Sequence, residues 1–404
     1  MLRWPAYFYQ FSATHAFLTG LLSFFIPVIL WRTHHSLALL AGFISLSGAG
    51  FLGFLVLWEK IRTSPFILLT LLGSYIANAV TAVILALGLT GNGVIVILAL
   101  LNGFYGCFYW LSLRTLFVSR PTMIKNRSVS GNRFGNFQLT VAICLKTGLL
   151  LGSLLIGNQQ TAWLVLVFSF VLLGIGLTLA CTRQTNHPLS AALAAPSVRI
   201  MDLRQWATRT GVRPVFVVDG LFLFLESYFW ILSLYFLGSQ SLSRLGLIVV
   251  SLAVLLSFLF FFIKRWIDAS HAIRVFRLAL VLYAGSWILR ALVDDIVQPT
   301  LLTATILVIA FTTSFFRLSF NKLFFDRIEP GNALVCILAK SWYTQMGVAI
   351  FFGLLALMLM FQGAEPAGSQ TLSYIYWCSA PLALFYLLYS RNNAPVHSVA
   401  DLEI

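Results

Sequence analysis

The segment Ser112-Leu-Arg-Thr-Leu-Phe-Val-Ser-Arg120 recurs without a gap as Ser319-Phe-Asn-Lys-Leu-Phe-Phe-Asp-Arg327. The serine, the Leu-Phe pair and the final arginine coincide, and each copy stands at the end of an apolar run. A Gly-Asn pair follows each copy, at Gly135-Asn136 and at Gly331-Asn332, and leads into a further apolar run that contains a lysine. This recurrence indicates that the chain consists of two equivalent halves.

The composition excludes a water-soluble fold. Of the 404 residues, 60% are hydrophobic and 9% are charged, whereas an ordinary soluble domain has roughly 25% charged residues. A β-barrel would alternate apolar and polar residues, but the apolar runs here are continuous. The net charge of +14 is scattered over short loops rather than gathered on one domain, so we expect no nucleic-acid partner.

Twelve apolar ranges are each long enough to cross a bilayer as a helix, which needs about 20 residues. The breaks after the second, fourth, eighth and tenth ranges are basic, and the odd-numbered breaks carry almost no positive charge. Because Lys and Arg mark the cytoplasmic side, we expect both termini in the cytoplasm. The ranges are 11–31, 37–57, 65–87, 94–118, 135–156, 161–181, 214–237, 243–263, 273–293, 300–323, 334–360 and 371–390.

The sequence therefore predicts an all-α polytopic membrane protein of four parts. These are a six-helix bundle at 1–181, a cytoplasmic linker at 182–213, a second six-helix bundle at 214–390 and a cytoplasmic tail at 391–404. The linker segment 198–209 places its apolar residues near one helical face, which is typical of a helix lying in the membrane interface. A plain tether is the alternative.

The cysteines give no sign of a metal or redox site. The five of them are widely separated and show no C-x-x-C or metal-ligand spacing. We therefore interpret them as small buried hydrophobic residues, and we expect neither a metal nor a cofactor. They are Cys107, Cys144, Cys181, Cys336 and Cys378.

Six spans, a basic cytoplasmic linker and six more spans in repeat-related halves resemble the major facilitator superfamily (MFS) of secondary transporters. The resemblance is architectural, because the family's loop signature G-x-x-x-D-R-x-G-R is poorly matched by Trp58-Glu-Lys-Ile-Arg62 and by the segment 266–274. Gly148 and Gly152 in the fifth span also lack the proline that drug antiporters carry there. These departures indicate a divergent branch. The resemblance implies two pseudo-symmetric bundles around a central cavity lined by spans 1, 2, 4, 5, 7, 8, 10 and 11.

Ionisable side chains within the spans are the candidate functional residues. Such a group costs about 2.5 to 3.5 kcal/mol at mid-bilayer on insertion scales, so each one needs a reason. At about 1.5 Å of rise per residue, three of the candidates lie near the midplane, two more lie deep, and one stands closer to the cytoplasmic boundary. The three near the midplane are Lys146, Glu226 and Lys340, the two other deep ones are His15 and Arg317, and the one closer to the boundary is Asp219.

The cations among them are candidate substrate contacts. Lys146 and Lys340 occupy related positions in the two halves, which suits binding an anionic group between the bundles. The alternative is that each lysine neutralises a carboxylate, with Glu226 as the partner. Arg317 would add positive potential to the cavity. His15 is either a substrate hydrogen-bond donor and proton carrier or a buried packing residue.

The acids are candidates for proton coupling. Glu226 suits this role because burial and a neighbouring cation act on its charge in opposite directions; a static ion pair is the alternative. Asp219 stands seven residues earlier, near the same helical face, where it could couple to protons or contact cytoplasmic loops. We expect Arg114 and Lys322, close to span ends, to snorkel to the interface as structural residues.

The deep cations outnumber the acids, so the cavity is expected to be net positive and to favour an anion. The sequence thus predicts a secondary transporter of a small organic anion or zwitterion that works by alternating access and is coupled to protons. The alternatives are a flippase or exporter of an amphipathic lipid-like molecule and a non-transporting receptor or assembly factor. An integral-membrane enzyme would need a catalytic cluster that the sequence lacks. We expect a monomer in a bacterial inner membrane.

Overall fold

The computed structural model describes residues 6–64, 68–87, 91–118, 127–157, 162–184, 197–269, 272–326, 332–361 and 368–391. These residues form helices joined by short connections, with no strand among them. The end of the first repeat copy at 119–120, Arg327 and Gly331 fall outside the described residues, as do linker residues 185–196 and tail residues 392–404.

Each of the twelve expected apolar ranges overlaps a helix. Within the described residues, nine helical segments are long and apolar enough to cross a membrane. The first half of the sequence forms α1 (Ala6–Leu21), α2 (Ile26–His34), α3 (Leu37–Arg62), α4 (Leu69–Ala86), α5 (Asn92–Val118), α7 (Arg127–Gly157) and α8 (Ala162–Gln184). After α10 (Ile200–Arg209) come α11 (Arg213–Phe224), α12 (Trp230–Leu237), α13 (Leu242–Ala269), α14 (Ala272–Ala291), α15 (Pro299–Asp326), α16 (Ala333–Phe361), α17 (Gly368–Ala383) and α18 (Leu387–Arg391).

Three of the expected spans are interrupted by short turns. The 3-10 turn η1 (Ser23–Phe25) separates α1 from α2, where Pro27 has no N–H to continue the helical ladder. The π-helical turn η2 (Leu225–Phe229) joins α11 to α12. Pro381 lies inside α17, which the 3-10 turn η4 (Leu384–Tyr386) joins to α18.

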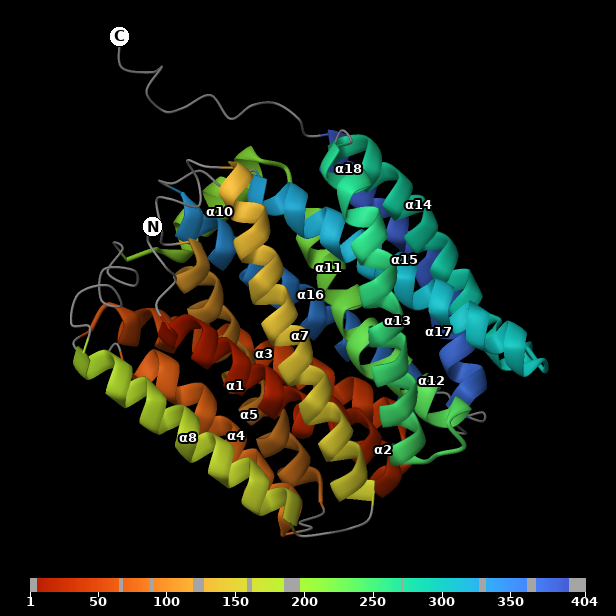
Figure 1. The fold of residues 1–404 in the computed structure, drawn as a ribbon, viewed down its shortest axis with the longest axis horizontal. Helices are drawn as coiled ribbons and strands as arrows, with labels where there is room; N and C mark the ends of the chain where they lie inside the picture. Colours follow the sequence, from red (N-terminus) through yellow and green to blue (C-terminus); the bar gives the residue numbers. More distant parts are fainter. Residues whose placement is uncertain are drawn as a thin grey trace.

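The packing of the helices centres on α16. Helix α1 packs against α7 and α8, and α4 packs against α5 and α8, whereas α14 packs against α15 and α17. Helix α16 contacts α3 and α5 from the first half of the sequence and α11 from the second half. Figure 1 shows α1 to α8 mostly toward one side, α12 to α15 together with α17 and α18 toward the other, and α11 and α16 in the middle.

Two helix pairs are held close by reciprocal glycines. A Cβ on Gly20 of α1 would lie 2.2 Å from a carbonyl oxygen of α7, and one on Gly148 of α7 would lie 2.2 Å from a carbonyl oxygen of α1. The same arrangement recurs about 200 residues later, where Gly220 of α11 and Gly347 of α16 would bring a Cβ within 2.1 Å and 2.0 Å of the facing backbone. Side chains at these positions would force the helices apart.

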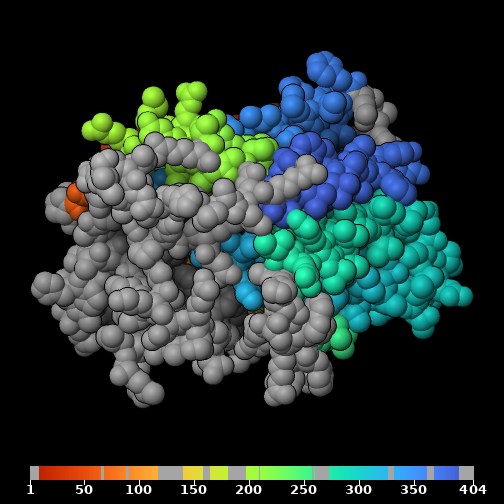
Figure 2. All heavy atoms as spheres, turned by 90° about the horizontal axis from the view of Figure 1, so that it is seen from above, coloured from red at the N-terminus to blue at the C-terminus, as the bar shows by residue number. Residues whose placement is uncertain are grey.

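The linker segment contains the expected helix, α10, which packs against α16. Leu203 is buried together with Trp58 and Leu338, whereas Ile200, expected on the same apolar face, is half exposed. The backbone N–H of Val198 donates to Glu59 Oε1 at 2.9 Å and so ties the linker to the end of α3. Figure 2 shows the lime-green segment that includes α10 on the surface.

Candidate functional site

Arg317 joins two carboxylates of the α11–η2 segment. Its Nη1 donates to Asp219 Oδ1 at 2.5 Å, and its Nε and Nη2 donate to the two oxygens of Glu226 at 2.9 and 3.0 Å. The planar guanidinium suits such two-point binding of a carboxylate. The structure therefore brings together three of the residues that the sequence predicts, from α11, η2 and α15.

The backbone explains why the two acids face one arginine. Asp219 and Glu226 are seven residues apart, which is about two helical turns, so they lie on one side of the segment. Glu226 stands in the π turn η2, where the N–H of Trp230 bonds to the carbonyl of Leu225. Such turns are frequent at functional sites, and nothing in the sequence Leu-Glu-Ser-Tyr-Phe indicated this one.

Two tyrosines also donate to the acids, each to an oxygen that Arg317 already binds. Tyr386 donates to Asp219 Oδ1 at 2.6 Å, and Tyr283 donates to Glu226 Oε1. The side chain of Asp219 is 1% exposed, whereas those of Glu226 and Arg317 are 14% and 17% exposed. The network is therefore closed at Asp219 and open at Arg317 and Glu226.

Lys340 on α16 is paired only loosely. Its Nζ lies 4.0 Å from Asp219 Oδ2 and makes no hydrogen bond with any described residue. The ammonium instead stands 4.6 and 4.4 Å from the ring centroids of Phe320 and Phe324, and its side chain is 8% exposed. Cation–π contacts of this kind partly replace lost hydration. One alternative for Lys340 was an ion pair with Glu226. That alternative is wrong, because the acid beside Lys340 is Asp219.

Arg114 on α5 also belongs to this region, which sequence reasoning missed. Its Nη1 donates to Ser341 Oγ on α16 at 3.1 Å, and its guanidinium lies 5.6 Å from the ring of Trp110. The expectation that Arg114 snorkels to the interface is wrong, because its head group points onto α16. Its short distance from the end of α5 made the outward orientation the natural assumption.

Lys146 on α7 does not join the network. It is partly buried and makes no hydrogen bond or ion pair with any described residue. The expectation that Lys146 and Lys340 occupy related positions is wrong. Gly148 and Gly347 are equivalent by their helix contacts, but Lys146 stands two residues before Gly148, whereas Lys340 stands seven residues before Gly347. Glu226, the expected partner of the lysines, is bound by Arg317 instead.

His15 lies apart from the charged residues, in a cluster of aromatic side chains. It is fully buried, its ring stacks on Tyr75 at 4.0 Å, and the rings of Phe11 and Tyr109 each lie 4.6 Å away. Its Nε2 is 3.0 Å from Ser74 Oγ, whereas Nδ1 has no hydrogen-bond partner among the residues that the structure describes. These contacts favour the packing interpretation of His15.

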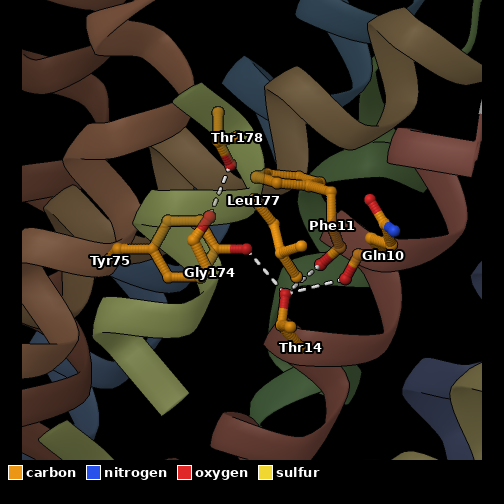
Figure 3. Close-up of a pocket in the computed structure, with 7 residues that line it drawn as sticks. All are labelled: Gln10, Phe11, Thr14, Tyr75, Gly174, Leu177 and Thr178. Carbon is orange, nitrogen blue, oxygen red and sulfur yellow. Dashed lines mark hydrogen bonds between the residues drawn. The ribbon is translucent and has the colours of Figure 1, made fainter. Parts of the chain in front are cut away.

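A small hollow beside this cluster is shown in Figure 3. Thr14 and Tyr75 share a hydrogen bond of 2.6 Å across it, and Thr178 donates to the carbonyl of Gly174 at 2.8 Å. The hollow has no room for a water molecule. It is therefore no binding site in this conformation.

Arg290 at the end of α14 is a second buried cation that the sequence did not single out. It donates to Ser286 Oγ at 2.8 Å and to Thr313 Oγ1 at 2.6 Å, and the ring of Trp287 lies 4.2 Å from its guanidinium carbon. The alternation of charges in the loops gave no sign of its burial. In the described part of the chain, no group of His, Cys, Asp and Glu side chains could hold a metal ion.

Two solved structures have a fold similar to that of this chain. Two crystal structures of the nucleoside transporter NupG, one of them of a point mutant, superpose on this chain with TM-scores of 0.63 and 0.65 (mutant). They cover 96% and 95% of this chain and 99% and 98% of their own, and both are 13% identical to it in sequence. No family model matches the chain, and no curated protein matches it.

The likeness shows that this chain shares the fold of these two structures over nearly its whole length, in agreement with the fold expected from the sequence. The apolar helices and this fold make the chain an integral membrane protein.

Proposed function

We propose that this chain is a secondary transporter of a small organic anion or zwitterion, coupled to protons and working by alternating access. In this proposal, residues 1–181 and 214–390 form two six-helix bundles of twelve spans, joined by the linker 182–213. The linker, the tail and the start of the chain lie in the cytoplasm, and the protein acts as a monomer in a bacterial inner membrane.

The balance of charge supports an anionic cargo. Three cations, Arg114, Arg317 and Lys340, surround the two acids Asp219 and Glu226. Three positive charges face two negative ones, so the region carries a net charge of +1 when all five groups are ionised. A net positive region between low-dielectric walls concentrates anions.

The shared arginine supports coupling through Glu226 and Asp219. A proton on Glu226 neutralises the carboxylate that accepts two bonds from Arg317, and a neutral acid is a weaker acceptor for a guanidinium. Arg317 then shifts toward Asp219 and loosens its hold on η2. Because α11 packs against α16 and α12 packs against α2, this change acts on contacts between helices from both halves of the sequence.

The observation that carries the proposal is the network in which Arg317 binds both acids within the membrane-spanning helices while staying 17% exposed. A purely structural ion pair in lipid is expected to be enclosed. Lys146 and His15 stay predictions as substrate contacts, because neither touches the network.

Transport by purified protein in liposomes with an imposed pH gradient tests the proposal. The cargo panel contains benzoate, glucuronate and inorganic phosphate, with fluorescently labelled phospholipid for the flippase alternative. We expect one soluble anion to accumulate with the gradient. Glu226→Gln should abolish the effect of the gradient on accumulation, and Lys146→Ala should weaken uptake. Cargo movement by both variants that equals the parent would contradict the proposal.

A nucleoside is the second candidate cargo. The transporter whose fold is similar carries nucleosides by its name, and its structures cover nearly the whole chain. Uridine in the same liposome panel separates the two classes, because it is neutral at pH 7 and gains little from the cations. Uptake of uridine in preference to every anion would replace the anionic cargo with a nucleoside.

A further inference from the structure

We propose that Arg114 and Lys340 form a two-point binding site for a carboxylate or phosphate group, located between α5 and α16. This inference rests on the proposed function and names the residues that bind the charged group of the cargo. It differs from the expectation drawn from the sequence, in which Lys146 and Lys340 bind the anionic group between the bundles.

Lys340 has unused binding capacity. An ammonium carries three donors, yet Lys340 Nζ makes no hydrogen bond with a described residue, and its pairing with Asp219 is at the 4.0 Å limit of an ion pair. The rings of Phe320 and Phe324 flank it but accept no conventional hydrogen bond. A buried charge in this state is costly unless a further partner is supplied.

Arg114 likewise has donors to spare. A guanidinium carries five N–H donors, and within the described part of the chain that of Arg114 makes one hydrogen bond, to the neutral hydroxyl of Ser341. Arg317 is the opposite case, because it already donates to three carboxylate oxygens. An anion at Arg317 would have to displace Glu226 or Asp219, whereas an anion at Arg114 displaces at most a serine.

The two spare cations lie together. Ser341 directly follows Lys340 on α16, so the bond from Arg114 brings the guanidinium onto the part of α16 that carries the ammonium. Arg114 is also within electrostatic range of Lys340 and of Asp219. Asp219 offsets only one of these two positive charges and is itself bound by Arg317, so a further anion beside both cations is electrostatically favoured. A carboxylate or phosphate offers two or more oxygens, which matches two donor groups.

The position of the site gives it a role in alternating access. Arg114 belongs to α5, in the first half of the sequence, and Lys340 belongs to α16, in the second half. An anion bound by both cations stabilises the arrangement in which α5 and α16 approach each other. Since Lys340 also faces Asp219, occupation of the site draws Lys340 away from that acid and leaves Asp219 more dependent on Arg317.

Thermal unfolding in phosphatidylcholine nanodiscs, followed by the fluorescence of the 11 tryptophans, tests the site. The probes are benzoate and inorganic phosphate, each titrated against chloride at constant ionic strength. We expect at least one probe to raise the melting temperature of the parent. Arg114→Gln and Lys340→Gln should each weaken the apparent affinity at least tenfold, and the double variant should lose little more than either single one.

Matched controls separate binding from folding. Lys60→Gln removes an exposed cation of α3 and should leave the response to the probe unchanged. Lys340→Arg keeps the charge and should retain part of the affinity even if Lys340→Gln folds poorly. Adding phosphatidylglycerol tests the source of the anion: if this lipid raises the melting temperature through Arg114 and Lys340 and blocks the probe, the site binds a lipid headgroup and the cargo assignment is wrong.

The remaining outcomes distinguish this inference from the proposed function. A parent that neither probe stabilises, or single variants that respond like the parent, would overturn the site. Anion transport that persists at parental affinity in Arg114→Gln would overturn the site and leave the proposed function standing. Stabilisation through both cations without transport of any anion would support the site and contradict the proposed function.

Discussion

Replacing Arg317 with glutamine should destabilise the protein through the acids it leaves behind. The substitution removes three hydrogen bonds and leaves Glu226 with the neutral hydroxyl of Tyr283 and no cation, while Asp219 keeps Tyr386 and the distant Lys340. Removing one partner of a buried ion pair costs about 3 to 5 kcal/mol. The partial exposure of the network favours the lower end, so we expect a loss of about 3 kcal/mol in the free energy of unfolding.

A double-mutant cycle with Glu226→Gln isolates the interaction. Unfolding is followed by tryptophan fluorescence as dodecyl sulfate is titrated into mixed micelles. Because Arg317→Gln combined with Glu226→Gln leaves no unpaired charge at that position, the double variant should recover about half of the loss. Residues in contact couple by about 0.5 to 3 kcal/mol in such cycles. A loss below about 1 kcal/mol for Arg317→Gln, or strictly additive effects, would refute the argument.

An arginine outside the network provides the control. Arg244 is exposed, and the hydroxyl of Ser239 is the one hydrogen-bond partner of its guanidinium among the described residues. Its replacement by glutamine should change the free energy of unfolding by no more than about 0.5 kcal/mol. A comparable loss for Arg244→Gln and Arg317→Gln would mean that the micelle assay senses total charge rather than the network.

Three further substitutions test the fold around the site. Gly347→Ala would place a Cβ 2.0 Å from a carbonyl oxygen of α11, so the free energy of unfolding in the same titration should fall by about 1 to 3 kcal/mol. Gly53→Ala is the control: a Cβ there has nothing within 4 Å, so this substitution should be neutral or stabilising. Tyr386→Phe removes the 2.6 Å bond to Asp219 and should cost about 1 to 3 kcal/mol; a neutral result would exclude that bond as a support of the acid. Glu59→Gln weakens the bond to the linker backbone, so limited trypsin digestion should cut the linker faster than in the parent, and equal rates would contradict the contact.

The apolar runs were sufficient to predict the helices. Charged and turn-forming residues bounded each run closely enough that every expected range overlaps an observed helix. Pro27 was present in the first range, and its missing N–H explains the break between α1 and α2 that the run of apolar residues concealed. The sequence also contains the reciprocal glycines, Gly20 and Gly148 in the first half and Gly220 and Gly347 about 200 residues later. Their spacing would have aligned the two halves of the repeat.

The partners of the charges could not be read from the sequence. Arg317 lies 98 and 91 residues from Asp219 and Glu226 along the chain, so their pairing depends on how α11 and α15 pack. The sequence also gave no sign of the π turn that carries Glu226. Depth along a helix does not determine direction around it, and for this reason Arg114 was assigned outward while its guanidinium contacts α16.

Transport through the network requires water to reach a positively charged chamber there, and thiol labelling measures this directly. Glu226→Cys is introduced into a chain whose five native cysteines are replaced by serine, and is treated with an anionic and a cationic methanethiosulfonate of similar size. We predict that the anionic reagent reacts at least tenfold faster and that adding Arg317→Gln reduces this preference toward one. No reaction with either reagent, or faster labelling by the cationic one, would contradict the account.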